Sequence, residues 1–125
     1  MTLKRILIVD DEADIRTVAQ ASLEIMGDWE VITAASGHEG IAKAETEKPD
    51  LILLDVMMPD IDGPTAFLQL RANPQTQNIP VVLLTAKVQA ADQRRFADLG
   101  VTAVFAKPFD PVTLSDDLMA ILDRG

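Results

Sequence analysis

The chain has 125 residues, 48% of them hydrophobic, which suits a single domain with one buried core. It contains no cysteine, and this excludes disulfides, thiolate metal ligands and cysteine nucleophiles. Twenty acidic residues against eleven basic ones give a formal charge of −9. Such a surface repels nucleic-acid phosphates, so we expect no direct binding of nucleic acid by this domain.

The apolar stretches are far shorter than the ~20 residues of a membrane span, and the first residues lack the pattern of a signal peptide. We therefore expect a cytoplasmic protein that does not enter a membrane. No linker, internal repeat or low-complexity tract interrupts the sequence. Residues 1–125 are predicted to form one domain, without a second domain.

Five short apolar segments, typical of buried parallel strands, alternate with five helix-like segments. In chain order, the pattern predicts a strand over residues 4–9, a helix over 13–26, a strand over 30–34, a helix over 38–47, a strand over 50–55, a helix over 64–72, a strand over 80–85, a helix over 88–99, a strand over 102–106 and a helix over 111–123. Short links between alternating strands and helices imply right-handed parallel crossovers. The prediction is an α/β protein, a three-layer sandwich with the sheet between two layers of helices.

Local residues mark the ends and the buried faces of the helices. Gly27 is a stop signal after the first helix, and Asp110 with Pro111 is a start signal for the fifth, as N-cap and first helical residue. Apolar residues three and four apart predict the buried stripe of the first helix: Ile15, Val18, Ala19, Leu23 and Met26. The corresponding stripe of the fifth helix is Leu114, Leu118, Ile121 and Leu122.

Residues capable of phosphoryl chemistry stand at the carboxyl ends of four predicted strands: Asp10 and Asp11, Asp55, Thr85, and Lys107. In an open parallel sheet, ligands bind outside the carboxyl ends of the strands. If the strands follow the doubly wound order 2-1-3-4-5, the first and third are neighbours and the three carboxylates converge. Two unit charges ~5 Å apart repel by ~3 kcal/mol at an effective dielectric of ~20, so the cluster must be protonated or neutralised. Carboxylate ligands with room for water and phosphate oxygens favour Mg²⁺.

Lys107 and Thr85 complete this cluster. An ammonium at the end of the fifth strand can pair with Asp55 and then with a phosphoryl oxygen, and the Thr85 hydroxyl can donate to the same group. Pro108, directly after Lys107, is a candidate for a cis peptide bond. Each residue taken alone also fits a helix cap, a turn or an ordinary strand end, and only the five together favour a phosphoryl site.

Five motifs fall in a fixed order: Val9-Asp10-Asp11-Glu12, Leu54-Asp55-Val56-Met57-Met58-Pro59, Asp62-Gly63, Leu84-Thr85-Ala86 and Ala106-Lys107-Pro108-Phe109. With these motifs the chain resembles the receiver domain of two-component response regulators over about residues 3–122. The resemblance implies a flavodoxin-like fold with the strand order 2-1-3-4-5. It also implies one receiver domain without an output domain, acting in signalling and not as an enzyme.

The resemblance further assigns roles to the site residues. Asp55 would be the phosphoacceptor, and Lys107 and Thr85 would contact the phosphoryl group. The Mg²⁺ ligands would be Asp10, Asp11, Asp55 and the backbone carbonyl of Met57. The phosphodonor would be a histidine kinase or a histidine phosphotransfer protein, and phosphorylation would switch the binding of a downstream effector protein.

Several positions depart from common receiver sequences. Val104 stands where many receivers have Tyr or Phe, so the coupling between a threonine and a reorienting aromatic is expected to be weak. Met57 and Lys87 flank the expected path of the hydrolytic water, and Met57 cannot orient water, which predicts slow loss of phosphate. Acids that form a charged dimer face in receivers joined to winged-helix domains are missing at Thr102 and Ala103. We therefore expect a monomer or a weak dimer.

Two other functions fit parts of the pattern. A haloacid-dehalogenase-like phosphatase also uses an aspartyl phosphate and Mg²⁺, but it requires Asp-x-Asp-x-Thr after the first strand, where this chain has Asp10-Asp11-Glu12-Ala13-Asp14. A binding module that keeps the fold without being phosphorylated is the second, and equal partner affinity of wild type and Asp55→Asn would favour it. Nucleotide binding is less favoured because no P-loop or Gly-x-Gly-x-x-Gly motif follows the first strand.

Overall fold

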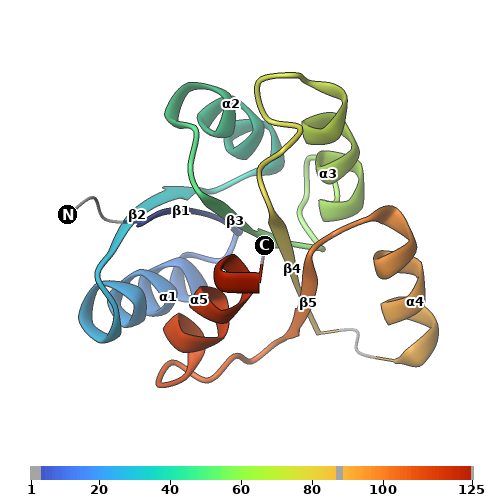
Figure 1. Ribbon diagram of the computed structural model, residues 1–125. Coiled ribbons are helices and arrows are strands. Elements are labelled where there is room, and N and C mark those ends of the chain that lie inside the picture. The colour runs from blue at the N-terminus through green and yellow to red at the C-terminus, as the bar shows by residue number, and fades with distance from the viewer. Residues whose placement is uncertain (1–3, 87–88, 125) are drawn as a thin grey trace.

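The computed structural model describes residues 4–86 and 89–124, in which five strands alternate with five helices (Figure 1). The elements are β1 (Lys4–Val9), α1 (Ala13–Met26), β2 (Trp29–Ala34), α2 (Gly37–Glu47), β3 (Leu51–Asp55), α3 (Gly63–Ala72), β4 (Val81–Thr85), α4 (Ala90–Leu99), β5 (Ala103–Ala106) and α5 (Leu114–Arg124). The strands form one parallel sheet in the order β2-β1-β3-β4-β5, which confirms the predicted flavodoxin-like fold. None of the helices in this described part of the chain combines the length and the apolar character needed to cross a bilayer.

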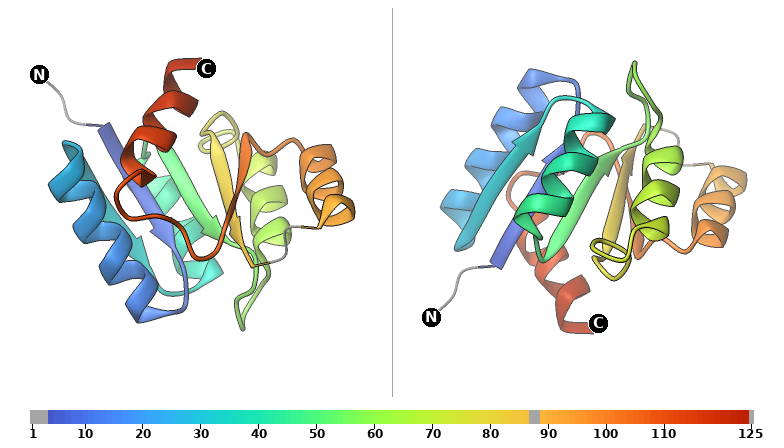
Figure 2. Two further views of the ribbon diagram at one scale, coloured as in Figure 1. Left: turned by 90° about the horizontal axis from the view of Figure 1, so that it is seen from below. Right: turned by 90° about the horizontal axis from the view of Figure 1, so that it is seen from above.

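Helices cover both faces of the sheet. α1 and α5 lie together on one face, and α2, α3 and α4 lie on the other (Figures 1 and 2). Successive strand residues point to opposite faces, so Ile6 and Ile8 pack against α1 and α5, whereas Leu7 and Val9 pack against α2 and α3. Because both faces are covered, the central strands need no polar side, which explains their continuous apolar sequences.

The buried stripe of α1 differs from the prediction. Ala19 and Leu23 are buried as expected, but Val18 and Met26 are exposed, so the prediction for these two residues was wrong. Ser22 is buried in their place. Its hydroxyl donates to the carbonyl of Pro111, so burial leaves no unpaired polar group, and a polar residue takes a core position that hydrophobic periodicity assigned to apolar ones.

The start of the fifth helix is also corrected. The helix was predicted to begin at residue 111, but α5 begins at Leu114. The other predicted ends of strands and helices agree with the structure within two residues. Residue 88, the predicted start of the fourth helix, lies outside the described residues. Residues 111–113 form a turn in which Asp110 Oδ1 accepts from the Val112 amide at 2.9 Å. The Pro111 carbonyl accepts from Ser22 of α1, a tertiary contact that holds this segment as a turn. The predicted stripe of α5 is confirmed, because its members are buried or pack against the core: Leu114, Leu118, Ile121 and Leu122.

Gly63 closes the loop that leaves the sheet after β3. A Cβ at this residue would lie 2.5 Å from the Asp55 carbonyl oxygen and 2.9 Å from Val56 Cα, both of them backbone atoms. We expect Gly63→Ala to lower the free energy of unfolding by about 3 kcal/mol, because neither neighbour can move aside. Urea unfolding measures this. Gly100→Ala, where φ is 98° but nothing lies within 4 Å of the added Cβ, should cost only about 1 kcal/mol. Equal losses in the two variants would contradict the steric explanation.

Candidate functional site

The carboxyl ends of β1, β3, β4 and β5 meet at one edge of the sheet because these strands are parallel neighbours. Asp10 follows β1, Asp55 and Thr85 end β3 and β4, and Lys107 follows β5. The side chains of Asp10, Asp55 and Thr85 are buried, although two of them are ionisable. Buried carboxylates are unfavourable unless they are paired or bind a cation, so this edge is more than a packing arrangement.

Three carboxylates converge at this edge as predicted. One oxygen from each of Asp10, Asp11 and Asp55 lies within 4.8 Å of the other two. Asp10 and Asp55 are buried, whereas Asp11 is exposed at the rim. The cluster is therefore closed on the sheet side and open to solvent on the side of Asp11.

Lys107 provides a positive charge inside the cluster. Its Nζ lies 3.0 Å from Asp10 Oδ2 and 3.1 Å from Asp55 Oδ1, so the predicted pairing with Asp55 is confirmed. The Lys107–Pro108 peptide bond is cis, as the sequence suggested. Among the described residues, one ammonium pairs with two of the three clustered carboxylates and does not neutralise all of them.

Burial and like charge shift the ionisation of this cluster. Burial first, and then the charge of Asp10, raise the pKa of Asp55 from 3.8 to about 6, against the opposing effect of Lys107. Burial alone would lower the pKa of the Lys107 ammonium, but its interactions with Asp10 and Asp55 outweigh burial and raise that pKa above its ordinary value. Lys107 therefore stays charged, and the ionised form of Asp55 is less favoured than that of an exposed aspartate.

Two buried carboxylate oxygens lack a hydrogen-bond donor among the described residues, namely Oδ2 of Asp10 and Oδ2 of Asp55. The contact of Asp10 Oδ2 with Lys107 is an ion pair without hydrogen-bond geometry. Buried oxygens in this condition are costly, and a bound cation would satisfy both. An all-oxygen ligand set with an open side suits Mg²⁺, which keeps several waters. The residues present therefore fit a magnesium ion.

Met57 lies beside this cluster through its backbone. Its amide nitrogen is 3.4 Å from Asp55 Oδ1, a long hydrogen bond, and its side chain is 64% exposed. The backbone of Met57, whose carbonyl is the predicted metal ligand, therefore lies next to the carboxylate cluster. Lys87, the other residue predicted to flank the phosphoryl group, lies outside the described residues.

Two further residues at this edge were not identified from the sequence. Glu12 Oε1 lies 3.4 Å from Lys107 Nζ, and the Glu12 amide donates to Asp10 Oδ1 at 2.9 Å. Arg16 Nη1 donates to the Asp10 carbonyl at 2.7 Å. Glu12 stands within the first motif, and Arg16 follows it by one helical turn. Their closeness to Asp10 in the sequence could therefore have indicated both residues.

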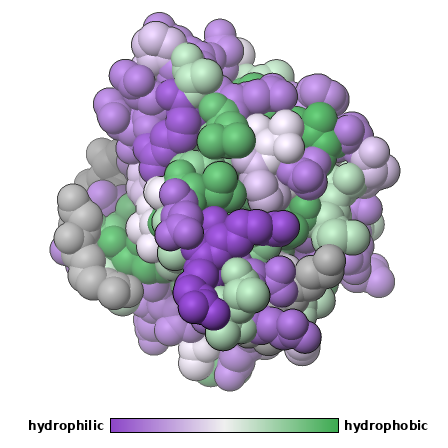
Figure 3. Space-filling view, turned by 90° about the vertical axis from the view of Figure 1, so that its right-hand side faces the viewer, coloured by the Kyte–Doolittle hydropathy of each residue, from purple (hydrophilic) through white to green (hydrophobic). Residues whose placement is uncertain are grey.

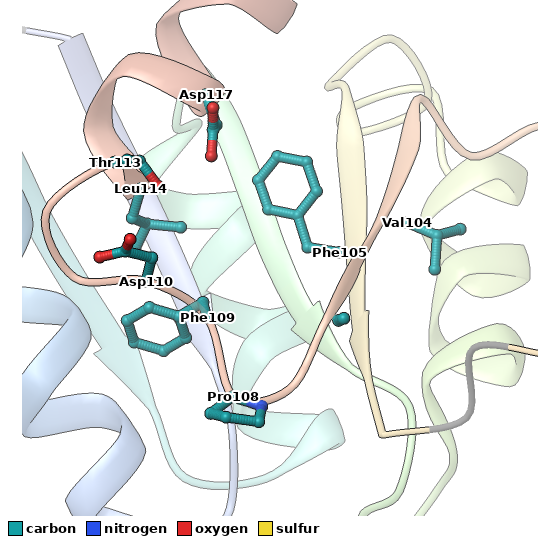
Figure 4. A pocket seen from close by; sticks show the side chains of 9 residues that line it. Val104, Phe105, Pro108, Phe109, Asp110, Thr113, Leu114 and Asp117 are labelled. Atoms are coloured by element: carbon teal, nitrogen blue, oxygen red, sulfur yellow. The ribbon is translucent and has the colours of Figure 1, made fainter.

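Val104 and Phe105 point to opposite sides of β5 (Figure 4). Phe105 points toward α5 and lines a hollow together with Phe109 and Leu114. Val104 packs on the other face, against the core beneath α3 and α4. Weak aromatic coupling at this position stays a prediction.

Comparison with known proteins gives consistent matches. The sequence profile described as the response regulator receiver domain matches residues 6–119. The alkaline phosphatase synthesis transcriptional regulatory protein PhoP of Bacillus subtilis is 46% identical over 122 residues, covering 98% of this chain and 50% of that protein. The DNA-binding dual master transcriptional regulator RpaA of Synechocystis is 38% identical, with 98% and 50% covered. The chemotaxis response regulator CheY4 of Vibrio cholerae has a solved structure that matches with a TM-score of 0.88 at 33% identity, covering 96% of this chain and 99% of that one. The chain spans about half the length of PhoP and of RpaA.

Proposed function

This chain belongs to the receiver domain family of two-component response regulators, and on that premise we propose that Asp55 is the aspartate that becomes phosphorylated. The observation that carries the proposal is the buried carboxylate of Asp55, which lies beside Asp10 and pairs with Lys107, with one oxygen lacking a donor in the described part of the chain. The phosphodonor is a histidine kinase or a histidine phosphotransfer protein. The proposed magnesium ligands are Asp10, Asp11, Asp55 and the backbone carbonyl of Met57.

The side chains of the site have separate tasks in the transfer. The Asp55 carboxylate attacks phosphorus in line as the donor's phosphorus–nitrogen bond breaks. Bound Mg²⁺ supplies positive charge that offsets both the carboxylates and the phosphoryl oxygens. Lys107 is 3.1 Å from Asp55 Oδ1, so a small movement of its flexible stem carries the ammonium to a phosphoryl oxygen. Thr85, at the end of the adjacent strand, donates a hydrogen bond from its hydroxyl to another phosphoryl oxygen.

Incubation with acetyl phosphate and Mg²⁺, followed by mass-spectrometric mapping of the modified residue, tests this assignment, and the phosphoryl group is expected on Asp55. The rival phosphatase activity predicts turnover of a phosphomonoester, and we expect none. We infer that the domain acts in signalling and not as an enzyme that turns over a substrate.

We propose that phosphorylation switches the binding of a downstream effector protein. PhoP and RpaA are named as transcriptional regulators, and both are about twice as long as the region matched here. The expectation that residues 1–125 form one receiver domain without direct nucleic-acid binding stays a prediction for these residues, supported by their charge of −9. It does not extend to a longer protein. A cytoplasmic location also stays a prediction.

We propose a monomer or a weak dimer on the basis of the surface near α4 and β5. Thr102 is exposed and Ala103 half-buried, and neither offers charge for an ionic dimer contact. Figure 3 looks at the side of the molecule that carries α4 and shows hydrophilic side chains over much of it, with hydrophobic ones in separate patches. This surface supports a monomer or a weak dimer.

Slow loss of the phosphoryl group is expected from the side chain of Met57. It is largely exposed beside Asp55 and has no group that orients an attacking water. An amide at this position can hydrogen-bond to water, so we expect Met57→Asn to shorten the half-life of the phosphorylated protein roughly tenfold. Decay after removal of the phosphodonor measures this. A wild-type half-life no longer than that of the variant would refute the prediction.

A further inference from the structure

The loop after Asp55 carries the proposed metal ligand at Met57, so its position matters to the site. At its base, the Val56 amide donates to the Leu84 carbonyl at 3.1 Å, and the Gly63 amide donates to the Val56 carbonyl at 2.8 Å. These bonds hold the two ends of the loop. Residues 57–61, the outer part of the loop, lie beyond them and are exposed or half-buried.

Asp60 holds this outer part against the N-terminus of α2. Its Oδ1 accepts from the Gly37 amide at 3.1 Å, and its Oδ2 accepts from the His38 amide at 2.8 Å. These are the first amides of the helix, which have no acceptor inside it. α2 has its own N-cap, since Ser36 Oγ accepts from the Glu39 amide at 3.1 Å. Asp60 is therefore an additional acceptor supplied by a distant loop.

An apolar contact accompanies these two hydrogen bonds. A Cβ at Gly37 would lie 2.5 Å from Ile61 Cγ1, so Ile61 packs directly on the bare backbone of the helix. The helix itself is seated on β1, because a Cβ at Gly40 would lie 2.7 Å from the methyl carbons of Val9. Asp60 therefore connects the loop to α2, which packs on the strand that leads to Asp10.

We propose that Asp60 is a positioning residue, which fixes the loop carrying the Met57 carbonyl by binding the N-terminus of α2. Asp60 is not one of the three clustered carboxylates, and its two oxygens are engaged by backbone amides. Outer contacts of this kind commonly control metal affinity without touching the metal. The inference rests on the proposed magnesium site.

Magnesium affinity of the full chain, measured by isothermal titration calorimetry, tests the proposal. Asp60→Ala removes both hydrogen bonds, and we expect the Kd for Mg²⁺ to rise about tenfold. Asp60→Asn keeps one acceptor oxygen and should give an intermediate Kd. It also keeps the test decisive if the alanine variant does not fold. In metal-free protein, amide NMR of Asp60→Ala should show shifted Gly37 and His38 signals.

Two control variants separate positioning from charge and from helix stability. Asp62→Asn removes one negative charge from the same loop but keeps an N-cap for α3, where Asp62 Oδ1 accepts from the Thr65 amide at 2.7 Å. Ser36→Ala removes the cap that α2 has of its own and leaves the loop contact intact. Both controls should stay within about twofold of the wild-type Kd, because neither alters the loop contact and exposed charges are screened.

The outcomes distinguish this inference from the proposed function. Wild-type affinity in Asp60→Ala, or an equal loss in Ser36→Ala or Asp62→Asn, would overturn the positioning role while leaving the magnesium site in place. A wild-type protein that binds no Mg²⁺ would overturn both together.

Discussion

Asp55→Asn is expected to reduce phosphorylation by acetyl phosphate to the background level, with Mg²⁺ present. An amide is a much weaker nucleophile than a carboxylate and cannot form an acyl phosphate, so the replacement removes the acceptor while keeping its shape. The neighbouring acids do not offer a substitute. Asp10 is engaged by Lys107 and by the Glu12 amide, and Asp11 is exposed at the rim.

Phosphate-affinity gel electrophoresis and intact-mass measurement of the two proteins check this expectation. Asp98→Asn, at an exposed position of α4, is the matched control and should be labelled like wild type. Undiminished labelling of Asp55→Asn would show that another residue is the acceptor, and the function proposed for Asp55 would fail.

Stability of the metal-free protein is expected to depend on pH through Asp55. Its pKa is raised from 3.8 to about 6 by burial and by Asp10, so the folded state binds the proton more tightly than the unfolded state. The resulting stabilisation is fully present below about pH 4 and is lost as pH rises through about 6. The loss amounts to at most about 3 kcal/mol, because the titration is shared with Asp10 and Lys107.

The Asp55→Asn side chain does not ionise, so this variant should not lose stability in this way as pH rises. We expect the variant to be about as stable as wild type near pH 4 and more stable by up to about 3 kcal/mol near pH 8, without metal. Titrating groups that do not interact with Asp55 are common to both proteins and cancel in the difference, whereas its coupling to Asp10 and Lys107 is part of the measured effect. Saturating Mg²⁺ should reduce the difference, because it binds and stabilises folded wild type.

Urea unfolding followed by the fluorescence of Trp29, the single tryptophan, measures both proteins across this pH range. Trp29 is buried and its indole nitrogen is 3.0 Å from Ser115 Oγ, so unfolding will change its surroundings. Asp98→Asn should follow wild type at every pH. A stability difference between Asp55→Asn and wild type that is independent of pH would contradict the assignment of a raised pKa to Asp55.

The pattern of the central strands β1, β3 and β4 was predictable because both of their faces are buried. Ile6 and Leu7 face opposite helical layers, so neither position tolerates a polar residue, and the run of apolar letters shows the strand directly. The polar residue that ends each run then marks the edge of the sheet. Asp55 and Thr85 were identified in this way from the sequence.

The errors arose where a tertiary contact replaced a local rule. Ser22 has a polar side chain that periodicity excludes from a core, yet the Pro111 carbonyl accepts its hydroxyl and makes burial possible. The same contact holds residues 111–113 as a turn and delays the start of α5. Val18 and Met26 lie at helical spacing from buried residues, but they are 44% and 52% exposed, so no neighbouring element covers them in the described part of the chain.

Local periodicity and the points where apolar runs stop are enough to predict the α/β class, the order of elements along the chain, and the residues at the strand ends. The meeting of their charges could be predicted only by assuming a strand order, which the tertiary structure supplies. That structure placed Lys107 between Asp10 and Asp55, left Asp55 Oδ2 without a donor among the described residues, and brought Asp60 to the first amides of α2. Contacts between residues far apart in the chain depend on strand order and helix placement, and no local pattern of the sequence contains them.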